Sequence, residues 1–283
     1  MITVIIPFYN GAITLNRVVE SMKNQIFKGW ELILVDDGST DDSATLAKEY
    51  LSDSRIRYVF QENQGVSVAR NHGAALASTE WLIFLDVDDN LEKDSLNIVI
   101  DQIRKKHDYG YFLFGMRRIK RETIIIQVPE DGIYFPKLAG TFVIKKSVFE
   151  EIGGYDRSLK FSENTELFHR IGLMGYFGVS SQNIILNYYD SPTGGSKNLQ
   201  NMSDSLLIFL EKHNDTLSIH VKHLYHQIIG VNCMRFRNFS NARKHLWKAV
   251  QYKPKRIATW GRLGLAFLPF LAKRLYSKTV KHD

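Results

Sequence analysis

Three aspartates, Asp86, Asp88 and Asp89, follow an apolar stretch over residues 81–85 that predicts a buried strand. Carboxylates this close repel one another unless a cation lies between them. Mg²⁺ or Mn²⁺ is typically held by one or two carboxylates together with substrate phosphates. The alternative is a solvated turn that caps a helix beginning near Leu91. We favour the metal site because a second acidic strand end is expected beside this one.

That second strand end carries Asp36 and Asp37, which follow the apolar residues 30–35. In parallel α/β sheets, ligands bind beyond the carboxyl ends of the strands. Asn10 follows the first apolar run of the chain, so three segments distant in sequence would meet in one crevice. The alternative for the aspartate pair is capping of a helix expected from Asp41, and both roles can hold together.

Other charged and titratable side chains have simpler explanations. Glu166 and Arg170 stand four residues apart in a predicted helix, which indicates an ion pair on the helix surface. His220, His223 and His226 also fall in a predicted helix, where the first and last point about 240° apart. One metal ion could not easily join all three, so we do not expect a metal site there.

The elements that position these residues alternate in the first part of the chain. Strands are expected over residues 2–6, 30–35, 56–60 and 81–85, and helices over residues 15–24, 41–51 and 66–77. This alternation is typical of βαβ units with a parallel sheet, hence an α/β fold. Further strands are expected over residues 111–115, 123–128, 140–144 and 184–189, and helices over residues 147–152 and 163–174.

The pattern becomes purely helical after about residue 200, with helices expected over residues 204–212, 216–235, 241–251 and 258–276. The stretch SPTGGSKN is loop-like, and we place the boundary between the two patterns near residues 195–203. We therefore expect an α/β domain over residues 1–198 and a helical region over residues 199–283.

Several protein classes are disfavoured by what the sequence lacks. The chain of 283 residues contains neither GxGxxG after its first strand nor GxxxxGK[ST], which argues against dinucleotide dehydrogenases and P-loop enzymes. Cys233 is its only cysteine, so no internal disulfide can form, which fits a reducing compartment. The N-terminus, MITVIIPFYN, is interpreted as a first strand rather than a signal peptide, because it has no basic segment and is interrupted by Pro7.

The net charge of +7 is concentrated at the C-terminal end. Residues 241–283 hold 11 Lys and Arg against one acid, a net +10, whereas the preceding residues sum to −3. Residues 260–271 read WGRLGLAFLPFL, too short and too broken by Arg262 and Pro269 to span a bilayer. Such a segment suits an interfacial helix on an anionic membrane surface. The alternatives are a core helix with solvated bases, and nucleic acid, which we disfavour because no binding module is recognisable.

Six stretches together resemble the inverting family 2 glycosyltransferases. They are VIIPFYN (4–10), ILVDDGSTDDS (33–43), ENQGVSVARNHG (62–73), WLIFLDVDD (81–89), IGGYD (152–156) and SENTELFHR (162–170). The resemblance covers roughly residues 1–190, and small bacterial enzymes that build surface polysaccharide look most similar. It implies a GT-A fold, in which a Rossmann-like, mainly parallel sheet is flanked by helices, here with a helical C-terminal appendage.

The resemblance also implies roles for donor-binding residues. Pro7 and Tyr9 would shape the first loop around the nucleotide base, and Asp36 would accept a hydrogen bond from that base. Arg70 would approach the diphosphate, unless it is only a charge on a helix surface. The aspartates of the DxDD cluster would hold the ribose and the metal, Mn²⁺ or Mg²⁺; they are Asp86, Asp88 and, in an assisting role, Asp89.

The acceptor side departs from the family pattern. In the family an Asp at the start of the helix after the Gly-Gly-aromatic-Asp loop is the general base, and Asn164 stands at that position here. An amide cannot usefully accept a proton near neutral pH. Three explanations remain open: Glu163 takes over the role, Glu166 or another acid serves, or Asn164 is a natural or engineered loss of the base.

The activity implied is metal-dependent, inverting transfer of a hexose-type sugar from a nucleotide diphosphate donor, expected to be a UDP-sugar. The acceptor would be a sugar or a lipid-linked saccharide, and the protein would be cytoplasmic and peripheral on the inner face of the cell membrane. The main rival is a nucleotide-sugar-binding relative without efficient turnover. A nucleotidyltransferase is disfavoured because no basic, glycine-rich triphosphate loop stands near the first strand.

Overall fold

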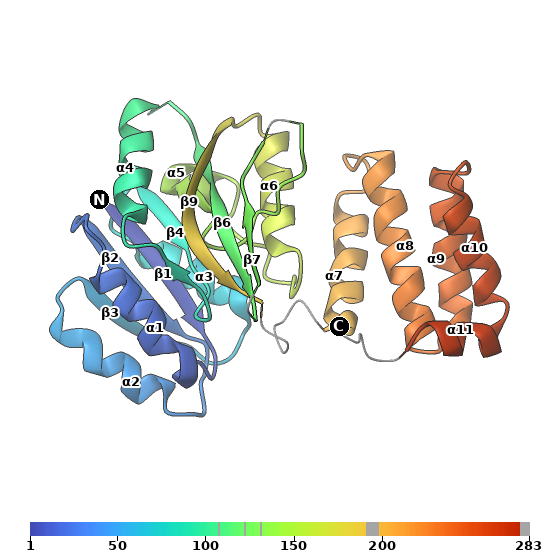
Figure 1. The fold of residues 1–283 in the computed structure, drawn as a ribbon, viewed down its shortest axis with the longest axis horizontal. Helices are drawn as coiled ribbons and strands as arrows, with labels where there is room; N and C mark the ends of the chain where they lie inside the picture. Colours follow the sequence, from blue (N-terminus) through green and yellow to red (C-terminus); the bar gives the residue numbers. More distant parts are fainter. Residues whose placement is uncertain (107, 122, 131, 191–197, 278–283) are drawn as a thin grey trace. The chain divides into compact units, whose positions relative to one another are not determined.

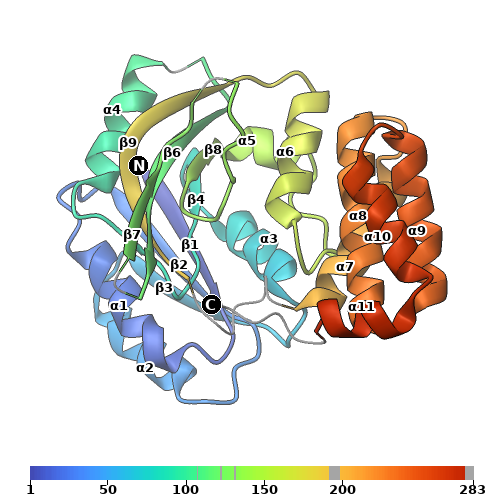
Figure 2. The same ribbon diagram turned by 45° about the vertical axis from the view of Figure 1, so that its right-hand side comes forward.

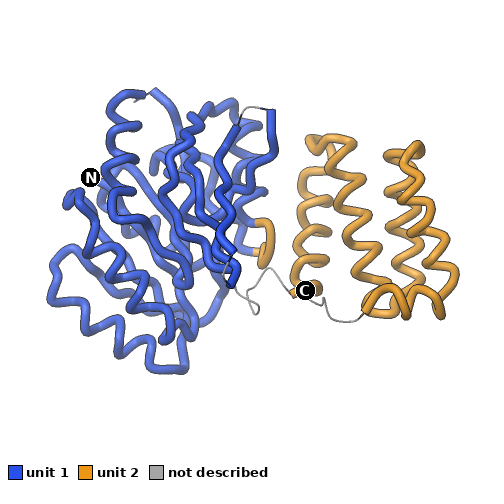
Figure 3. The backbone as a smooth tube through the Cα atoms, viewed as in Figure 1, with its two compact units in different colours: residues 1–157, 163–191 blue, residues 158–162, 192–283 orange. Residues whose placement is uncertain are grey.

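The computed structural model describes residues 1–106, 108–121, 123–130, 132–190 and 198–277. The chain divides into two compact units, drawn in different colours in Figure 3. One consists of residues 1–157 and 163–191, and the other of residues 158–162 and 192–283. The boundary expected near residues 195–203 lies partly outside the described residues, so the division at residue 198 stays a prediction.

The first unit is built on one sheet, which contains nine strands among the described residues in the order β3-β2-β1-β4-β8-β6-β9-β5, with β7 paired to β6. Its parallel half consists of β1 (Ile2–Phe8), β2 (Trp30–Asp36), β3 (Ile56–Phe60) and β4 (Trp81–Phe84). The other strands are β5 (Asn90–Leu91), β6 (Tyr111–Lys120), β7 (Thr123–Gln127), β8 (Phe142–Lys145) and β9 (Gly178–Tyr189). Strand β8 runs antiparallel between β4 and β6, while β9 is parallel to β6. The predicted α/β fold is confirmed.

Helices cover both faces of this sheet (Figures 1 and 2). Helices α1 (Ala12–Lys23) and α4 (Ser95–Lys105) lie on one face, and α3 (Val66–Leu76), α5 (Lys146–Glu151) and α6 (Glu163–Leu173) lie on the other. Side chains alternate across a strand, so neighbouring β1 residues such as Val4 and Ile5 enter different apolar clusters. Helix α2 (Ser43–Glu49) is followed by a 3₁₀ turn at Tyr50–Ser52.

Two features near the acidic cluster differ from expectation. The residues around Leu91 form the short strand β5 rather than the start of a helix, and β5 pairs with β9. Helix α4 begins only at Ser95, and it was not among the expected elements except as the alternative helix near Leu91. Its buried face consists of Leu96, Val99, Ile100 and Ile103, so the helical spacing was present in the sequence.

From residue 198 to residue 277 the second unit is helical, with α7 (Leu199–Lys212), α8 (Ile219–Arg235), α9 (Phe239–Tyr252), α10 (Ile257–Ala266) and α11 (Pro269–Leu275). Asparagine or serine caps begin three of them: Asn198, Ser218 and Asn238 accept hydrogen bonds from backbone N–H groups of the first turn. None of the helices described here is long and apolar enough to cross a membrane.

The single helix expected over residues 258–276 is wrong. The chain leaves helical geometry at Leu268 and re-enters it at Pro269, the first residue of α11. Proline lacks the N–H that a continuous helix would need, but it suits the first turn of a new one. The expected interfacial helix is therefore two short helices.

Candidate active site at the carboxyl ends of the strands

Loops from the parallel strands meet at one edge of the sheet. Phe8 at the end of β1 pairs with Asp36 at the end of β2. Beyond them, the Asn10 side-chain oxygen accepts a hydrogen bond from the backbone N–H of Thr40 at 2.8 Å. A Cβ atom on Gly11 would lie 3.1 Å from Val87, so the turn after β4 packs against the first loop. The structure thus brings the three predicted segments together.

Asp36 is fully buried, and both its carboxylate oxygens accept hydrogen bonds. The backbone N–H of Ser39 donates to one at 2.8 Å, and the hydroxyl of Tyr58 donates to the other at 2.9 Å. Burial and this bond raise the pKa of Tyr58 to about 12. An ionised carboxylate has further lone pairs, so it can also accept a base N–H. The role of Asp36 in binding a nucleotide base stays a prediction.

Asp37 holds the next loop. Its carboxylate accepts hydrogen bonds from the side-chain amide of Gln61 and from the backbone N–H groups of Gln64 and Gly65, at 2.8 to 2.9 Å. None of these donors belongs to helix α2, so the pair at residues 36–37 positions the surrounding loops. Pro7 is buried within β1, while Tyr9 follows that strand with 51% of its surface exposed.

The acidic cluster after β4 has the geometry of a cation site. One carboxylate oxygen from each of Asp86, Asp88 and Asp89 lies within 4.8 Å of the other two. Burial, followed by the charge of Asp86, raises the pKa of Asp88. Burial and both neighbouring carboxylates raise the pKa of Asp89 well above its usual range. Crowded, partly dehydrated oxygens of this kind fit a hard divalent cation such as Mg²⁺ or Mn²⁺.

Two residues that support this cluster had not been singled out from the sequence. The backbone N–H of Tyr189 donates to Asp89 at 2.9 Å, which ties the end of β9 to the cluster. The Arg17 guanidinium donates to the backbone carbonyl of Asp88 and lies 4.0 Å from the centre of the Tyr189 ring. No local pattern marks Arg17, because it is separated from both partners by long stretches of chain.

Arg70 connects the acidic cluster to the first turn of α6. Its two terminal nitrogens donate to Asp86 at 2.6 Å and to Glu163 at 2.9 Å. The side chain is 2% exposed, so the alternative of a charge on the helix surface is wrong. Burial alone would lower the pKa of Arg70, but the two carboxylates raise it above its ordinary value. The expected contact with a diphosphate stays a prediction.

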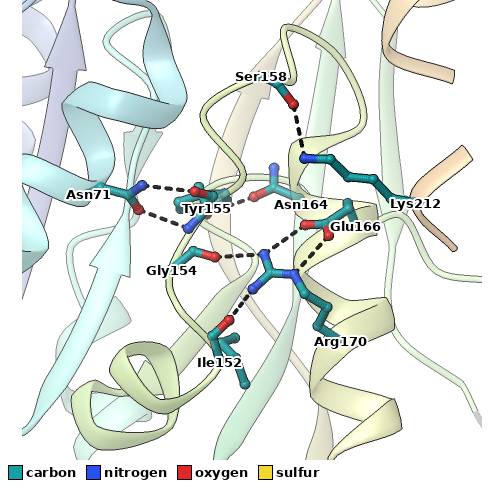
Figure 4. A network of polar contacts seen from close by, with 9 residues as sticks. All are labelled: Asn71, Ile152, Gly154, Tyr155, Ser158, Asn164, Glu166, Arg170 and Lys212. Carbon is teal, nitrogen blue, oxygen red and sulfur yellow. Dashed lines mark hydrogen bonds and ion pairs between the residues drawn. The ribbon is translucent and has the colours of Figure 1, made fainter. Parts of the chain in front are cut away.

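Asn71, which follows Arg70 in α3, holds the loop before α6 in place. The Asn71 amide donates to the backbone carbonyl of Tyr155 at 2.9 Å and accepts from its backbone N–H at 2.8 Å (Figure 4). Gly154 has a positive φ of 68°, and a Cβ atom there would lie 2.7 Å from the Asn71 side-chain oxygen. Asn71 and Tyr155 belong to two of the stretches that carry the family resemblance, although the contact between them was not predicted.

The Asn164 side chain is hydrogen-bonded within the same network. Its side-chain oxygen accepts a hydrogen bond from the Tyr155 hydroxyl at 2.8 Å, and its amide donates to Glu163 at 3.3 Å. Asn164 is 8% exposed, whereas the Glu163 side chain is 15% exposed. Both bonds to Glu163 end on Oε1. The carboxylate is thus oriented by Arg70 and Asn164 through one oxygen.

Glu166 pairs with Arg170 as predicted, but not on the surface. The two side chains form two contacts of 2.8 and 2.7 Å, and Glu166 is only 2% exposed. Arg170 also donates to the backbone carbonyls of Ile152 and Gly154 (Figure 4). This ion pair therefore closes the loop that precedes α6, which makes Glu166 a structural acid.

The three histidines considered earlier make separate contacts in the helical unit. His220 receives a hydrogen bond from Lys253 at 2.6 Å, and His223 contacts the backbone carbonyl of Ala249 at 2.8 Å. His226 lies 2.9 Å from His245 between their Nδ1 atoms. Burial and the neighbouring His245 lower the pKa of His226 to about 4.

The first part of the chain is similar in sequence to known glycosyltransferases. The model of the family described as "Glycosyl transferase family 2" matches residues 3–172. Glycosyltransferase GlyA of Streptococcus pneumoniae is 41% identical over 103 residues, which cover 36% of this chain and 15% of that protein. The cholesterol galactosyltransferase of Borreliella burgdorferi is 33% identical over 132 residues, which cover 44% of this chain and 36% of that protein.

Solved structures show the same architecture. Residues 1–349 of Staphylococcus aureus TarS in complex with UDP-GlcNAc match with a TM-score of 0.65 and 18% identity, covering 96% of this chain and 87% of that one. The chain spans only 15% and 36% of the length of the two relatives above. Because the family model nevertheless covers more than half of the chain, the protein belongs to glycosyl transferase family 2.

Proposed function

We propose that this protein is a metal-dependent, inverting glycosyltransferase. It moves a sugar from a nucleotide diphosphate donor, expected to be a UDP-sugar, to a sugar or lipid-linked saccharide acceptor of surface polysaccharide synthesis. The observation that carries the proposal is the Arg70 bridge, which holds Asp86 of the acidic cluster and Glu163 of α6 on one guanidinium. The UDP-GlcNAc complex of a TarS neighbour supports the donor class.

Glu163 is the general base of this proposal. The buried Glu166 is committed to Arg170 through both its oxygens, and Asn164 cannot take up a proton. Glu163 accepts bonds from Arg70 and Asn164 on Oε1, and among the described residues no hydrogen bond reaches its Oε2. Asn164 then acts as a positioning residue that links Glu163 to the Tyr155 hydroxyl.

The chemistry follows from these positions. The acceptor hydroxyl oxygen forms a bond to the anomeric carbon while the bond from that carbon to the diphosphate oxygen breaks. The hydroxyl proton passes to Glu163, and the nucleoside diphosphate leaves with the electron pair. A base that removes this proton in the transition state contributes roughly 10²–10⁴-fold in rate. Displacement from the opposite face inverts the anomeric configuration.

Asp86 and Asp88, with Asp89 assisting, would hold Mn²⁺ or Mg²⁺ and contact the donor ribose. A bound divalent cation supplies charge neutralisation for the departing diphosphate. Asp36, Pro7 and Tyr9 would receive the nucleotide base. Arg70 orients the carboxylates of Asp86 and Glu163, and it would also lie near a bound diphosphate.

The C-terminal region is assigned a role because of its positive charge. We assign catalysis to residues 1–198 and membrane contact to residues 199–283, where the segment 241–283 carries a net +10. The protein would then be peripheral on the cytoplasmic, inner face of the cell membrane, close to lipid-linked acceptors. Nucleic acid is not proposed as a partner.

The proposal is tested by UDP release and sugar transfer with a panel of UDP-sugars in the presence of Mn²⁺. We expect Glu163→Gln to lower kcat by roughly 10²–10⁴-fold while the donor still raises the melting temperature. Glu150→Gln, which changes the exposed member of an ion pair in α5, is the matched control and should keep wild-type activity. Full activity in Glu163→Gln would rule out Glu163 as the base.

A second variant separates the rival function. If the wild-type protein binds a UDP-sugar but releases no UDP, the protein is a nucleotide-sugar-binding relative. In that case Asn164→Asp should create turnover, because the new carboxylate would stand where the family has its base. Turnover in the wild-type protein together with loss in Glu163→Gln supports the enzyme.

A further inference from the structure

An aromatic groove lies on the helical unit between α9 and α10. It has a volume of about 550 Å³ and is lined by Arg243, Trp247, Trp260, Leu263, Gly264 and Phe267. The two tryptophan rings meet edge to face, with centroids 6.0 Å apart, and the side chains remain 48% and 45% exposed. Large aromatic side chains left this exposed on one surface mark an interaction site.

Exposed aromatic side chains also follow the groove residues along the chain. Phe267 is 62% exposed at the end of α10, and Phe270 is 86% exposed on α11. The same helices are anchored by buried side chains, since Leu263, which also lines the groove, and Ala272 pack with Leu246 in one apolar cluster. The exposed side chains therefore project from a packed scaffold, and truncation near Lys253 would destroy that scaffold rather than remove a tail.

The helices that form this surface are rich in basic residues. Residues 241–277 contain nine Lys and Arg and no Asp or Glu. Arg243 borders the groove, where its guanidinium lies 5.2 Å from the centre of the Phe267 ring and donates to the carbonyl of Ala266. Lys244 and Lys248 are exposed on the adjacent side of α9. An anionic partner is therefore electrostatically complementary to this surface.

The polar groups that line the groove argue against a saccharide. Sugar hydroxyls need several hydrogen-bonding partners, but the Trp260 indole N–H already donates to the carbonyl of Pro254, and Arg243 uses one of its donors on that of Ala266. An apolar cleft between tryptophans with a basic border suits a lipid. Acyl chains fill the apolar part, while lysine and arginine attract the headgroups.

We propose that the surface formed by α9, α10 and the start of α11 docks onto an anionic lipid bilayer, with Phe267 and Phe270 inserted and an acyl chain in the tryptophan groove. This inference deepens the proposed membrane contact and rests on it. The binding element is a folded surface built from three helices. It differs from the single amphipathic helix expected from residues 260–271.

Tryptophan fluorescence provides a direct readout. The four tryptophans divide into Trp30 and Trp81, which are 0% and 4% exposed, and the two groove tryptophans. Vesicles of phosphatidylglycerol and phosphatidylcholine with brominated acyl chains should quench the full-length protein through Trp247 and Trp260. Pure phosphatidylcholine vesicles should bind at least about tenfold more weakly, because roughly fivefold in affinity comes from each basic residue near an anionic surface.

Matched variants test the surface itself. Phe267→Ser with Phe270→Ser, and separately Lys244→Glu with Lys248→Glu, should each weaken vesicle binding by roughly tenfold or more. The controls are Phe177→Ser, which removes a 76% exposed side chain elsewhere, and Lys105→Glu with Lys106→Glu at the end of α4. These controls should leave vesicle binding unchanged.

The outcomes separate this proposal from the catalytic one. Equal binding to neutral and anionic vesicles, or unchanged binding by both surface variants, would overturn lipid docking. So would a dimer in gel filtration that Trp247→Glu dissociates, because a second copy would then cover the groove. UDP release with a soluble acceptor should be unaffected by the surface variants, so failure of catalysis alone leaves the docking result intact.

Discussion

Replacing Arg70 by Gln probes the centre of the site. The guanidinium donates to Asp86 at 2.6 Å and to Glu163 at 2.9 Å, and it lies 5.2 Å from the centre of the Tyr155 ring. Its Nε is buried without a partner, so the loss of that atom removes no hydrogen bond. Glutamine keeps part of the side-chain volume but loses the charge and the fork that reaches two carboxylates.

The loss in unfolding free energy depends on how well water can replace the arginine as a partner of the two carboxylates. Removing one partner of a buried ion pair costs about 3–5 kcal/mol because the other charge stays buried. Water compensates part of this cost here, since the Asp86 side chain is 38% exposed, while Glu163 at 15% recovers less. We therefore expect Arg70→Gln to lower the free energy of unfolding by about 2–4 kcal/mol.

Urea unfolding followed by circular dichroism measures this change. The control is Lys145→Gln, which removes an exposed ion pair with Glu80 and should cost about 0.2–1 kcal/mol. UDP release should fall in Arg70→Gln even under conditions where the variant is fully folded, because Glu163 loses its orienting partner. An Arg70→Gln protein as stable as the Lys145→Gln control would refute the bridge between the acidic cluster and α6.

Two further predictions concern stability. Gly154→Ala should destabilise the protein by about 1–3 kcal/mol, because the residue adopts a positive φ and the new Cβ would lie 2.7 Å from the Asn71 side-chain oxygen. Urea unfolding measures this loss. The control is Gly172→Ala, where the added Cβ would meet no atom of another part of the structure within 4 Å. The depressed pKa of His226, about 4 in the folded protein, should make stability fall as pH drops from about 6.5 toward 4, because only the unfolded chain then binds the proton. Melting temperatures at pH 7 and pH 5 should differ less in His226→Gln than in the wild-type protein, and an equal difference would contradict this assignment.

Local sequence patterns were sufficient for most of the elements. The strand over residues 56–60 was predicted with its observed bounds, and the first three helices were placed to within a few residues. Buried parallel strands are continuous apolar runs, and amphipathic helices repeat every three to four residues, so both are legible in short windows. The break at Pro269 and the helix beginning at Ser95 were missed although their signals were local.

The residue types at the strand ends likewise identified the acidic cluster and the family resemblance. What the sequence could not supply was the set of partners. The contacts at the site join residues that are from 16 to 93 positions apart. They are the ion pairs of Arg70 with Asp86 and Glu163, the hydrogen bonds between Asn71 and Tyr155, and the hydrogen bond from Arg17 to Asp88. Such pairings depend on how strands and helices pack.

Burial was the other property decided by the tertiary structure. Glu166 and Arg70 carry charges that ordinarily favour solvent, and the spacing of Glu166 and Arg170 predicted a surface pair. Both Glu166 and Arg70 are 2% exposed because packed elements surround them and opposite charges compensate them. Sequence by itself determined the fold class and the kinds of group at the site, since these follow from local composition and periodicity. Which carboxylate is bonded through one oxygen, as in Glu163, and which through both, as in Glu166, was decided only by long-range packing.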